Sequence, residues 1–277
     1  LYIRYTDKNM GDSKKYKIFV INMPGSDERW ANISAQLNRL GAPYERVDGV
    51  DARKLGANEI SKYYSFEKNR KIFPKPLRIG EIGCYIAHVN CWKKIVNQNI
   101  DFGMVLEDDV FLSGNFPDSI KFLYSYFNKW NFVLLHPETK KRLLYTSETY
   151  GVGYSLREYI RTSGGFMAYA VKRDIAEKLY KKILPFGCTA DTNSHLYYQY
   201  KVDVKSLFPP VVFHRGVLSE RVLDSRTVAH NFYPFARQVF QIKSYMGKVV
   251  YLAKRDGIKV FLKRMINLRQ VFPPEPL

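Results

Sequence analysis

Three consecutive carboxylates, Glu107, Asp108 and Asp109, interrupt an apolar, β-prone run that extends over residues 103–112. Carboxylates at the end of a buried strand are costly without a partner, and adjacent oxygen ligands suit a divalent cation. If the segment stays extended, Glu107 and Asp109 share one face and Asp108 points to the other. The pattern predicts a cation site, with a solvated or Lys/Arg-paired acidic turn as the alternative.

The stretch before this motif is typical of a βαβ unit. A β-prone run at residues 17–22 leads to Ser26, a helix N-cap, and the amphipathic helix that follows is closed by Gly41. A second β-prone run covers residues 44–47. Such a unit predicts a parallel sheet with a ligand crevice beyond its strand ends. Neither GxGxxG nor GxxxxGK[ST] occurs, which disfavours a dinucleotide fold or a P-loop.

A helical pattern begins at Gly80 and leads into the acidic run. Glu81 and His88 are seven residues apart, so both can project from one helical face. A buried structural role is the alternative for His88. Cys84 and Cys91 are interpreted as core thiols. The three cysteines form no CxxC pair, which predicts a reducing compartment.

The chain of 277 residues has a net charge of +18 and a pI near 9.6. This charge predicts an acidic partner: nucleic acid, an anionic membrane surface or a phosphorylated substrate. The sequence has no run of about 18 apolar residues and no apolar signal-peptide core. We therefore expect a cytoplasmic protein, either free or held peripherally on the inner face of a membrane.

The composition changes after about residue 228, where bases alternate with apolar residues. Between Arg237 and Arg269 there are nine bases and a single acid, Asp256. This pattern predicts basic amphipathic helices, which either dock on an anionic leaflet or pack their apolar stripe on the rest of the protein. The predicted division is a catalytic domain at residues 14–227 and a helical extension at residues 228–277.

Several blocks of the sequence, in this order and spacing, resemble glycosyltransferase family 25. The family includes bacterial lipopolysaccharide and lipooligosaccharide galactosyltransferases and, in animals, collagen galactosyltransferases. One departure is Ala87, where the family usually has Ser. The blocks that carry the resemblance are residues 18–22 with Glu28 and Arg29, residues 47–49, residues 80–84 with His88 and Trp92, and residues 105–110.

The resemblance implies a GT-A-like (Rossmann-like) α/β fold, a nucleotide-sugar donor, and inversion at the anomeric carbon. The donor is usually UDP-galactose and the divalent metal is usually manganese, with Mg²⁺ as an alternative to Mn²⁺. The expected activity is transfer of galactose to a lipopolysaccharide or lipooligosaccharide core acceptor, anionic and lipid-linked. UDP-glucose is the alternative donor.

The resemblance and the residue types together assign the site. Asp109 is the primary metal ligand, Glu107 and Asp108 contact metal or ribose, and His214 is a further ligand or else a surface residue. Inversion needs a base, for which Asp191 is the candidate, with a helix N-cap as its alternative role; His88 is the second catalytic candidate. The predicted donor-binding residues are Asn22, Arg29, Asp48, Gly49, Glu107, Asp108, Gly164 and Gly165.

Two other classes compete with the transferase. A basic nucleic-acid-binding protein would explain the charge, but the sequence has no helix-turn-helix, RNP or zinc signature, so no nucleic-acid partner is expected. A haloacid-dehalogenase-like phosphatase would also place acids after an apolar strand. Its chemistry needs a nucleophilic Asp where this chain has Glu107, which argues against it.

Overall fold

The computed structural model describes residues 3–5, 14–73, 75–136, 142–151, 153–162, 164–215 and 235–271. The strands are β1 (Ile3–Tyr5), β2 (Lys14–Asn22), β3 (Tyr44–Asp48), β4 (Phe102–Glu107), β5 (Val110–Leu112), β6 (Phe132–Leu134), β7 (Arg142–Thr149), β8 (Ser155–Tyr159), β9 (Ala168–Lys172), β10 (Val204–Phe208), β11 (Val212–His214) and β12 (Arg269–Val271). The α-helices are α1 (Asp27–Arg39), α2 (Ala57–Tyr63), α3 (Phe66–Ile72), α4 (Ile79–Asn97), α5 (Phe116–Ser125), α6 (Arg173–Ile183), α7 (Ala190–Asn193), α9 (Ala236–Asp256) and α10 (Ile258–Ile266). Three short 3₁₀ helices are η1 (Ala52–Lys54), η2 (Phe127–Lys129) and η3 (Ser194–Tyr200).

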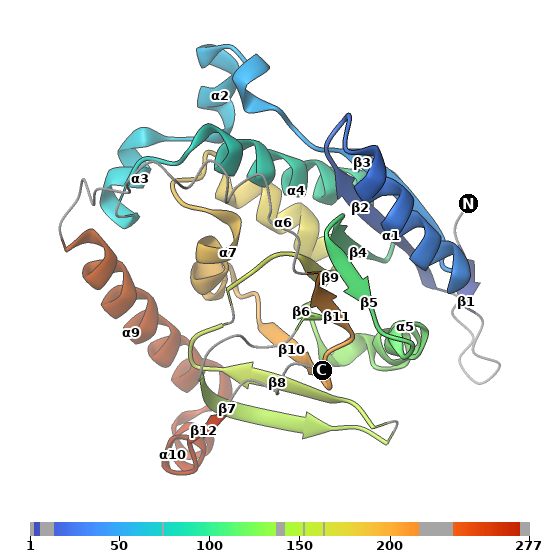
Figure 1. Ribbon diagram of the computed structural model, residues 1–277. Helices are drawn as coiled ribbons and strands as arrows, with labels where there is room; N and C mark the ends of the chain where they lie inside the picture. Colours follow the sequence, from blue (N-terminus) through green and yellow to red (C-terminus); the bar gives the residue numbers. More distant parts are fainter. Residues whose placement is uncertain are drawn as a thin grey trace.

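Most strands join one mixed sheet in the order β1-β2-β4-β9-β6-β10-β8-β7-β12, with β3 also paired to β2 (Figure 1). The strands β3, β2 and β4 are parallel to one another, whereas β9 runs antiparallel to both β4 and β6. A separate ribbon pairs β5 with β11. The predicted βαβ unit and the α/β class with a parallel core are confirmed. The strand β1 lies before residue 14, where the catalytic domain was expected to begin, and pairs with β2.

Helices cover both faces of the sheet, which explains why β4 is buried almost throughout. Val105 packs in the core that α4 and α6 share with the sheet, while Met104 and Leu106 pack on the side of α1 and α5. Gly103 is required by the close approach of α4, because a Cβ there would lie 2.3 Å from Cδ1 of Ile95. The alternation along β4 therefore aims odd-numbered side chains at α4, up to and including Glu107.

The C-terminal segment forms the two predicted helices and returns to the sheet. Helix α9 packs against η3 and α3, and α10 packs against α9 and β7. β12 then pairs antiparallel with β7 at the edge of the sheet. The predicted boundary between residues 227 and 228 lies outside the described residues. Among the helices that are described, none is long and apolar enough to cross a membrane.

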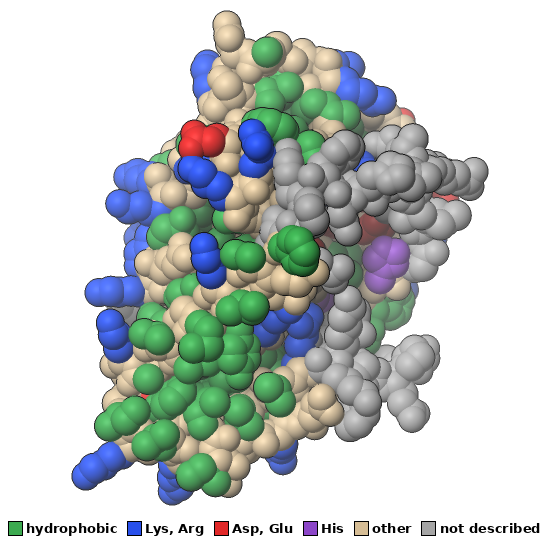
Figure 2. Space-filling view, turned by 90° about the vertical axis from the view of Figure 1, so that its left-hand side faces the viewer, with side chains coloured by type: hydrophobic (Ala, Val, Ile, Leu, Met, Phe, Trp, Pro, Cys, Tyr) green, Lys and Arg blue, Asp and Glu red, His purple; other side chains and the backbone are tan. Residues whose placement is uncertain are grey.

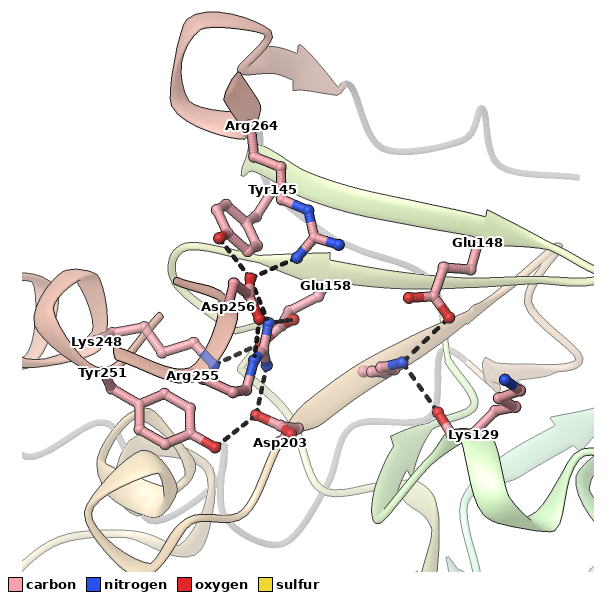
Figure 3. A network of polar contacts seen from close by, with 11 residues as sticks. Lys129, Tyr145, Glu148, Glu158, Asp203, Lys248, Tyr251, Arg255, Asp256 and Arg264 are labelled. Carbon is pink, nitrogen blue, oxygen red and sulfur yellow. Dashed lines mark hydrogen bonds and ion pairs between the residues drawn. The ribbon is translucent and has the colours of Figure 1, made fainter. Parts of the chain in front are cut away.

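A buried charge network fastens α9 to the sheet (Figure 3). Glu158 of β8 is 1% exposed and accepts hydrogen bonds from Lys248 Nζ at 2.7 Å and from Arg255 Nη2 at 2.9 Å. Arg255 also donates to Asp203 and Asp256. Two bases of the "amphipathic" segment are thus internal partners of acids rather than part of a solvated face.

The pKa of Asp256 shows how strongly this network stabilises a charged carboxylate. Burial alone would raise its pKa, but hydrogen bonds from Arg255 and Tyr145 and the charges of Arg255 and Arg264 outweigh burial and lower the pKa to about 2. The pKa in the folded state is below the unfolded value, so the contribution of Asp256 to stability is present above that value. It is lost as the pH falls toward about 2.

Replacing Glu158 with Gln should destabilise the fold by about 3 kcal/mol or more, because Lys248 and Arg255 lose their shared buried counter-ion. Urea unfolding monitored by circular dichroism measures the change. The matched control is Glu177→Gln, which removes an exposed partner of Lys181 and should cost less than about 1 kcal/mol. Equal effects of the two substitutions would contradict the role given to the network.

Candidate active site

The acidic run lies at the carboxyl end of β4, beside the end of β2, where Ile21 pairs with Glu107. The chain turns at Asp108 and Asp109 before β5 begins at Val110. The condition that the segment stays extended is therefore not met, and Glu107 and Asp109 point to different partners. Glu107 Oε1 lies 3.7 Å from His88 Nε2 on α4, whereas Asp109 faces Arg29 on α1.

Asp108 is held by the βαβ unit. Asn22, which is 1% exposed at the end of β2, donates from Nδ2 to Asp108 Oδ2 at 2.6 Å. Arg29, in the first turn of α1, lies 3.4 Å from Asp108 Oδ1 and 4.0 Å from Asp109 Oδ2. Burial raises the pKa of Asp108, while the hydrogen bond from Asn22 and the charge of Arg29 oppose the rise. Three predicted residues thus form one connected cluster.

Asp109 and His214 meet because β11 pairs with β5. The register sets His214 opposite Val110, and His214 Nε2 lies 3.8 Å from Asp109 Oδ2. The Arg215 amide donates to the Asp109 carbonyl at 3.0 Å. Ligand atoms at about 2.1 Å from one ion are about 3 Å apart when adjacent and about 4 Å apart when opposite. The separation therefore fits two ligands of one cation.

Asp48 and Gly49 complete this edge of the sheet. Asp48 ends β3 with its side chain exposed, and the Gly49 amide donates to the Asn22 carbonyl at 2.9 Å. A Cβ on Gly49 would lie 2.4 Å from Sδ of Met23, so a larger residue there would displace the Met23 side chain. Both residues thus lie next to Asn22.

A cavity of about 340 Å³ opens on the other side of Glu107. It brings together four predicted site residues: the two catalytic candidates His88 and Asp191, together with Glu107 and Gly165. Its full lining is Phe73, Glu81, Cys84, His88, Glu107, Gly165, Phe166, Thr189, Ala190, Asp191 and Thr192. The shared lining also confirms that Glu81 and His88 project from one face of α4.

His88 is completely buried and held through its ring. Trp92 Nε1 donates to the Tyr169 hydroxyl at 3.0 Å, and His88 Nδ1 lies 3.1 Å from the same oxygen. The Tyr169 oxygen accepts the hydrogen bond from Trp92, so the single proton of this hydroxyl can be donated to His88 Nδ1. This arrangement favours the tautomer with the proton on Nε2, the nitrogen that faces Glu107. His88 is both buried and directed at the cavity.

Cys84 differs from its prediction as a core thiol. It is half-buried, lines the cavity, and lies one turn before His88. Its Sγ, a ring nitrogen of His88 and a carboxylate oxygen of Glu107 all lie within 4.8 Å of one another. These three donors could hold a metal, but a thiolate beside an imidazole suits zinc better than Mn²⁺ or Mg²⁺. The spacing of four residues between Cys84 and His88 was the signal that could have revealed it.

Asp191 lies in the first turn of α7, whose N-cap is Thr189. The alternative role of Asp191 as an N-cap is therefore wrong. Its Oδ1 accepts from the Thr192 amide at 2.8 Å, and its Oδ2 would be 3.7 Å from a Cβ placed on Gly164. Gly165 has φ of +100°, a conformation that favours glycine, and its carbonyl accepts from His136 Nε2. The positive φ of Gly165 thus shapes the chain beside the cavity, whereas a Cβ on Gly164 would make only an ordinary contact with Asp191.

Sequence reasoning missed Tyr169, His136 and Thr189, which support this cavity, and predicted for Glu81 only that it shares a helical face with His88. Tyr169 and His136 gave no motif signal, because each acts through a neighbour that lies far away in sequence. Thr189 and Glu81 line the cavity from the starts of α7 and α4. Glu81 also accepts from the Arg78 amide at 2.7 Å and so fixes the first turn of α4.

A family model described as glycosyltransferase family 25 (LPS biosynthesis protein) matches residues 15–194, which is well over half of the chain. The chain therefore belongs to this family. This membership favours the transferase over the nucleic-acid-binding and phosphatase alternatives.

The curated relatives are similar over a limited segment. Procollagen galactosyltransferase 1-A of Xenopus laevis is 30% identical over 102 residues, and a glycosyltransferase 25 family member of Aedes aegypti is 30% identical over 101 residues. Each match covers 34% of this chain and 16% of the relative. The chain thus matches less than a fifth of the length of these relatives.

Two solved structures are similar to the chain at low sequence identity. One is a glycosyltransferase involved in the glycosylation of the major capsid of PBCV-1, with 11% identity and a TM-score of 0.41 over 74% of this chain and 94% of that one. The other is A197 from STIV, with 10% identity and a TM-score of 0.38 over 69% of this chain and 80% of that one.

Because Cys84 lines the cavity, we expect it to react with thiol reagents faster than the two buried cysteines. Iodoacetamide should alkylate Cys84 at least about 100-fold faster than Cys91 or Cys188, because both of those thiols are buried and burial raises their pKa. Peptide mass spectrometry of a time course on the native protein measures the three rates. Comparable rates would place Cys84 in the core and contradict its position in the cavity wall.

Proposed function

We propose that this protein is a metal-dependent, inverting hexosyltransferase that moves galactose from UDP-galactose to a lipopolysaccharide or lipooligosaccharide core acceptor. UDP-glucose is the alternative donor. The observation that carries the proposal is the arrangement around the end of β4. Asp108 and Asp109 lie with Arg29 and His214 on one side, and Glu107 lines a cavity with His88 and Asp191 on the other.

The side of the β4 end on which Asp108 and Asp109 lie would bind the nucleotide. Asn22, Asp48 and Gly49 lie at the ends of β2 and β3, where parallel α/β sheets bind nucleotides. The exposed Asp48 carboxylate can accept hydrogen bonds from ribose hydroxyls. Arg29 already lies within 4.0 Å of both aspartates, so its guanidinium is placed to bind a diphosphate beside them.

Asp109 and His214 would hold the cation, since their separation fits a shared ion and their oxygen and nitrogen donors suit manganese. A cation bound there would supply neutralisation of the charge that develops on the leaving diphosphate. Glu107 was expected to join these ligands. Its contact with His88 instead supports a role for it in the cavity, next to the sugar.

The cavity side would hold the transferred hexose and the acceptor hydroxyl. The acceptor oxygen attacks the anomeric carbon from the face opposite UDP, and its proton moves to the Asp191 carboxylate. The bond to the acceptor oxygen forms while the bond to the phosphate oxygen breaks, and that electron pair leaves with UDP. The Nε2 proton of His88 and the Glu107 carboxylate are placed to orient sugar hydroxyls.

Two features support an anionic, lipid-linked acceptor. The net charge of +18 attracts phosphorylated or acidic oligosaccharides, and the description of the family names LPS biosynthesis. Such acceptors are built at a membrane surface, so we also propose that the protein works on the cytoplasmic face of the inner membrane.

Replacing Asp109 with Asn should weaken Mn²⁺ binding in the presence of UDP by more than about 100-fold, since loss of a direct ligand should exceed the 10–100-fold cost typical of outer-shell partners. Electron paramagnetic resonance of free Mn²⁺ measures the affinity. Cys84→Ser is the matched control and should leave Mn²⁺ binding unchanged. If Cys84→Ser or Glu107→Gln removed the ion and Asp109→Asn did not, the cation site would lie at the other cluster.

Replacing Asp191 with Asn should lower the turnover number for transfer from UDP-galactose by about 10²–10⁴-fold, the usual contribution of a general base. The affinity for UDP, measured by calorimetry, should stay within about twofold of that of the wild type. The exposed Asp118→Asn serves as control and should change neither quantity. Normal turnover in the Asp191 variant would exclude it as the base.

A further inference from the structure

Helix α9 presents an apolar stripe that no described part of the chain covers. Phe235 precedes the helix, and Val239, Ile242, Met246 and Val250 follow at steps of three or four residues, so that all five align on one face. All five side chains are exposed, and Ile242 is 63% exposed. The opposite face of α9 is buried through Phe240, Leu252 and the network around Glu158.

Helix α10 repeats this arrangement. Ile258, Leu262 and Ile266 recur at steps of four residues, all are exposed, and Ile266 is 83% exposed. Phe261 points inward and is buried. Figure 2 looks onto the side of the molecule where α9 and α10 lie and shows hydrophobic side chains gathered over its lower half, with Lys and Arg at the margins. Contiguous apolar surface of this kind marks an interaction site.

The bases of the segment whose side chains the structure describes divide into two groups. Lys248, Arg255 and Arg264 bind Glu158, Asp203 or Asp256 and are therefore internally neutralised. A second group is exposed and carries its charge outward. It consists of Lys243, Lys254, Lys259, Lys263 and Arg269.

The outward bases adjoin the stripes. On α9, Lys243 and Lys254 follow Ile242 and Val250 by one and four residues, which places them beside the apolar face. On α10, Lys259 and Lys263 directly follow Ile258 and Leu262. The sole acid within α9 and α10, Asp256, is engaged in the network. The exposed face therefore combines apolar side chains with charge of one sign.

We propose that the α9–α10 face, defined by the two apolar stripes and the exposed lysines, docks on an anionic lipid bilayer. Apolar side chains would enter the boundary between headgroups and acyl chains while lysines contact acidic headgroups, as in interfacial amphipathic helices. A nucleic-acid surface would match the charge but leave the apolar stripes unused. The proposal is independent of the donor and of the catalytic residues.

Docking by this face would place α9 between the lipid surface and the segment that follows Asp191. Helix α9 packs on η3, which directly follows α7 and Asp191. Gly247 makes the contact possible, since a Cβ there would lie 2.0 Å from the Tyr198 hydroxyl. The helix that meets the bilayer is thus braced against the segment that carries the proposed base.

The test is sedimentation of the full chain with phosphatidylcholine vesicles that contain or lack phosphatidylglycerol, at low and high salt. The wild type should bind the anionic vesicles at least about tenfold more tightly than neutral ones, and added salt should weaken this binding. Ile242→Ser combined with Met246→Ser and Ile266→Ser should weaken anionic binding at least about tenfold. Lys243→Gln combined with Lys254→Gln, Lys259→Gln and Lys263→Gln should do the same and reduce the salt dependence.

Phe66→Ser and Lys182→Gln are matched controls, because each alters an exposed residue outside the α9–α10 face. The controls should bind as the wild type does, and every variant should retain its melting temperature and the rate of UDP-galactose hydrolysis in solution. Equal binding to neutral and anionic vesicles would overturn the proposal. The proposal would also be overturned if light scattering showed a dimer that the Ser variant dissociates. It would likewise be overturned if the protein bound no vesicles but bound an oligonucleotide, and the Ser variant retained that binding.

Discussion

Three carboxylates at the end of a buried strand impose the constraint that arranges this molecule. Each needs a partner away from water, and a regular strand would aim Glu107 and Asp109 at the same one. The turn at Asp108 and Asp109 separates them, so that Glu107 faces His88 while Asp109 faces Arg29 and His214. Asn22 holds Asp108 from the neighbouring strand. Segments far apart in the sequence thus converge on one strand end.

This separation produces two adjoining environments with different chemistry. The aspartate side is rich in oxygen and imidazole donors with a guanidinium nearby, which suits a cation and a diphosphate. The Glu107 side is a walled cavity in which His88 is fixed by Tyr169 and Trp92. A transferase needs such a division, because the leaving group and the attacking hydroxyl act on opposite faces of one carbon.

Local periodicity was sufficient to predict several of the elements but not all of the contacts. The βαβ unit, the helix beginning near Gly80 and the two C-terminal helices follow from patterns of three, four or two residues, which the backbone imposes directly. The sequence pattern left both an extended strand and an acidic turn open after Glu107, and only the structure shows that the chain turns there. His214 was assigned through the family resemblance, and only the pairing of β11 with β5 shows how it reaches Asp109. The bases after residue 236 look alike in the sequence. Only tertiary packing distinguishes Lys248 and Arg255, which pair with Glu158, from the lysines that face outward.

The central claim is that the cation for transfer lies between Asp109 and His214 and not in the Cys84–His88–Glu107 cluster. Anomalous diffraction from a crystal of the protein with Mn²⁺ and UDP tests it directly. We expect a single strong manganese peak at coordinating distance from Asp109 Oδ2 and His214 Nε2, with the diphosphate beside it. A peak at Cys84, His88 and Glu107, or bound UDP with no manganese peak near Asp109, would contradict it.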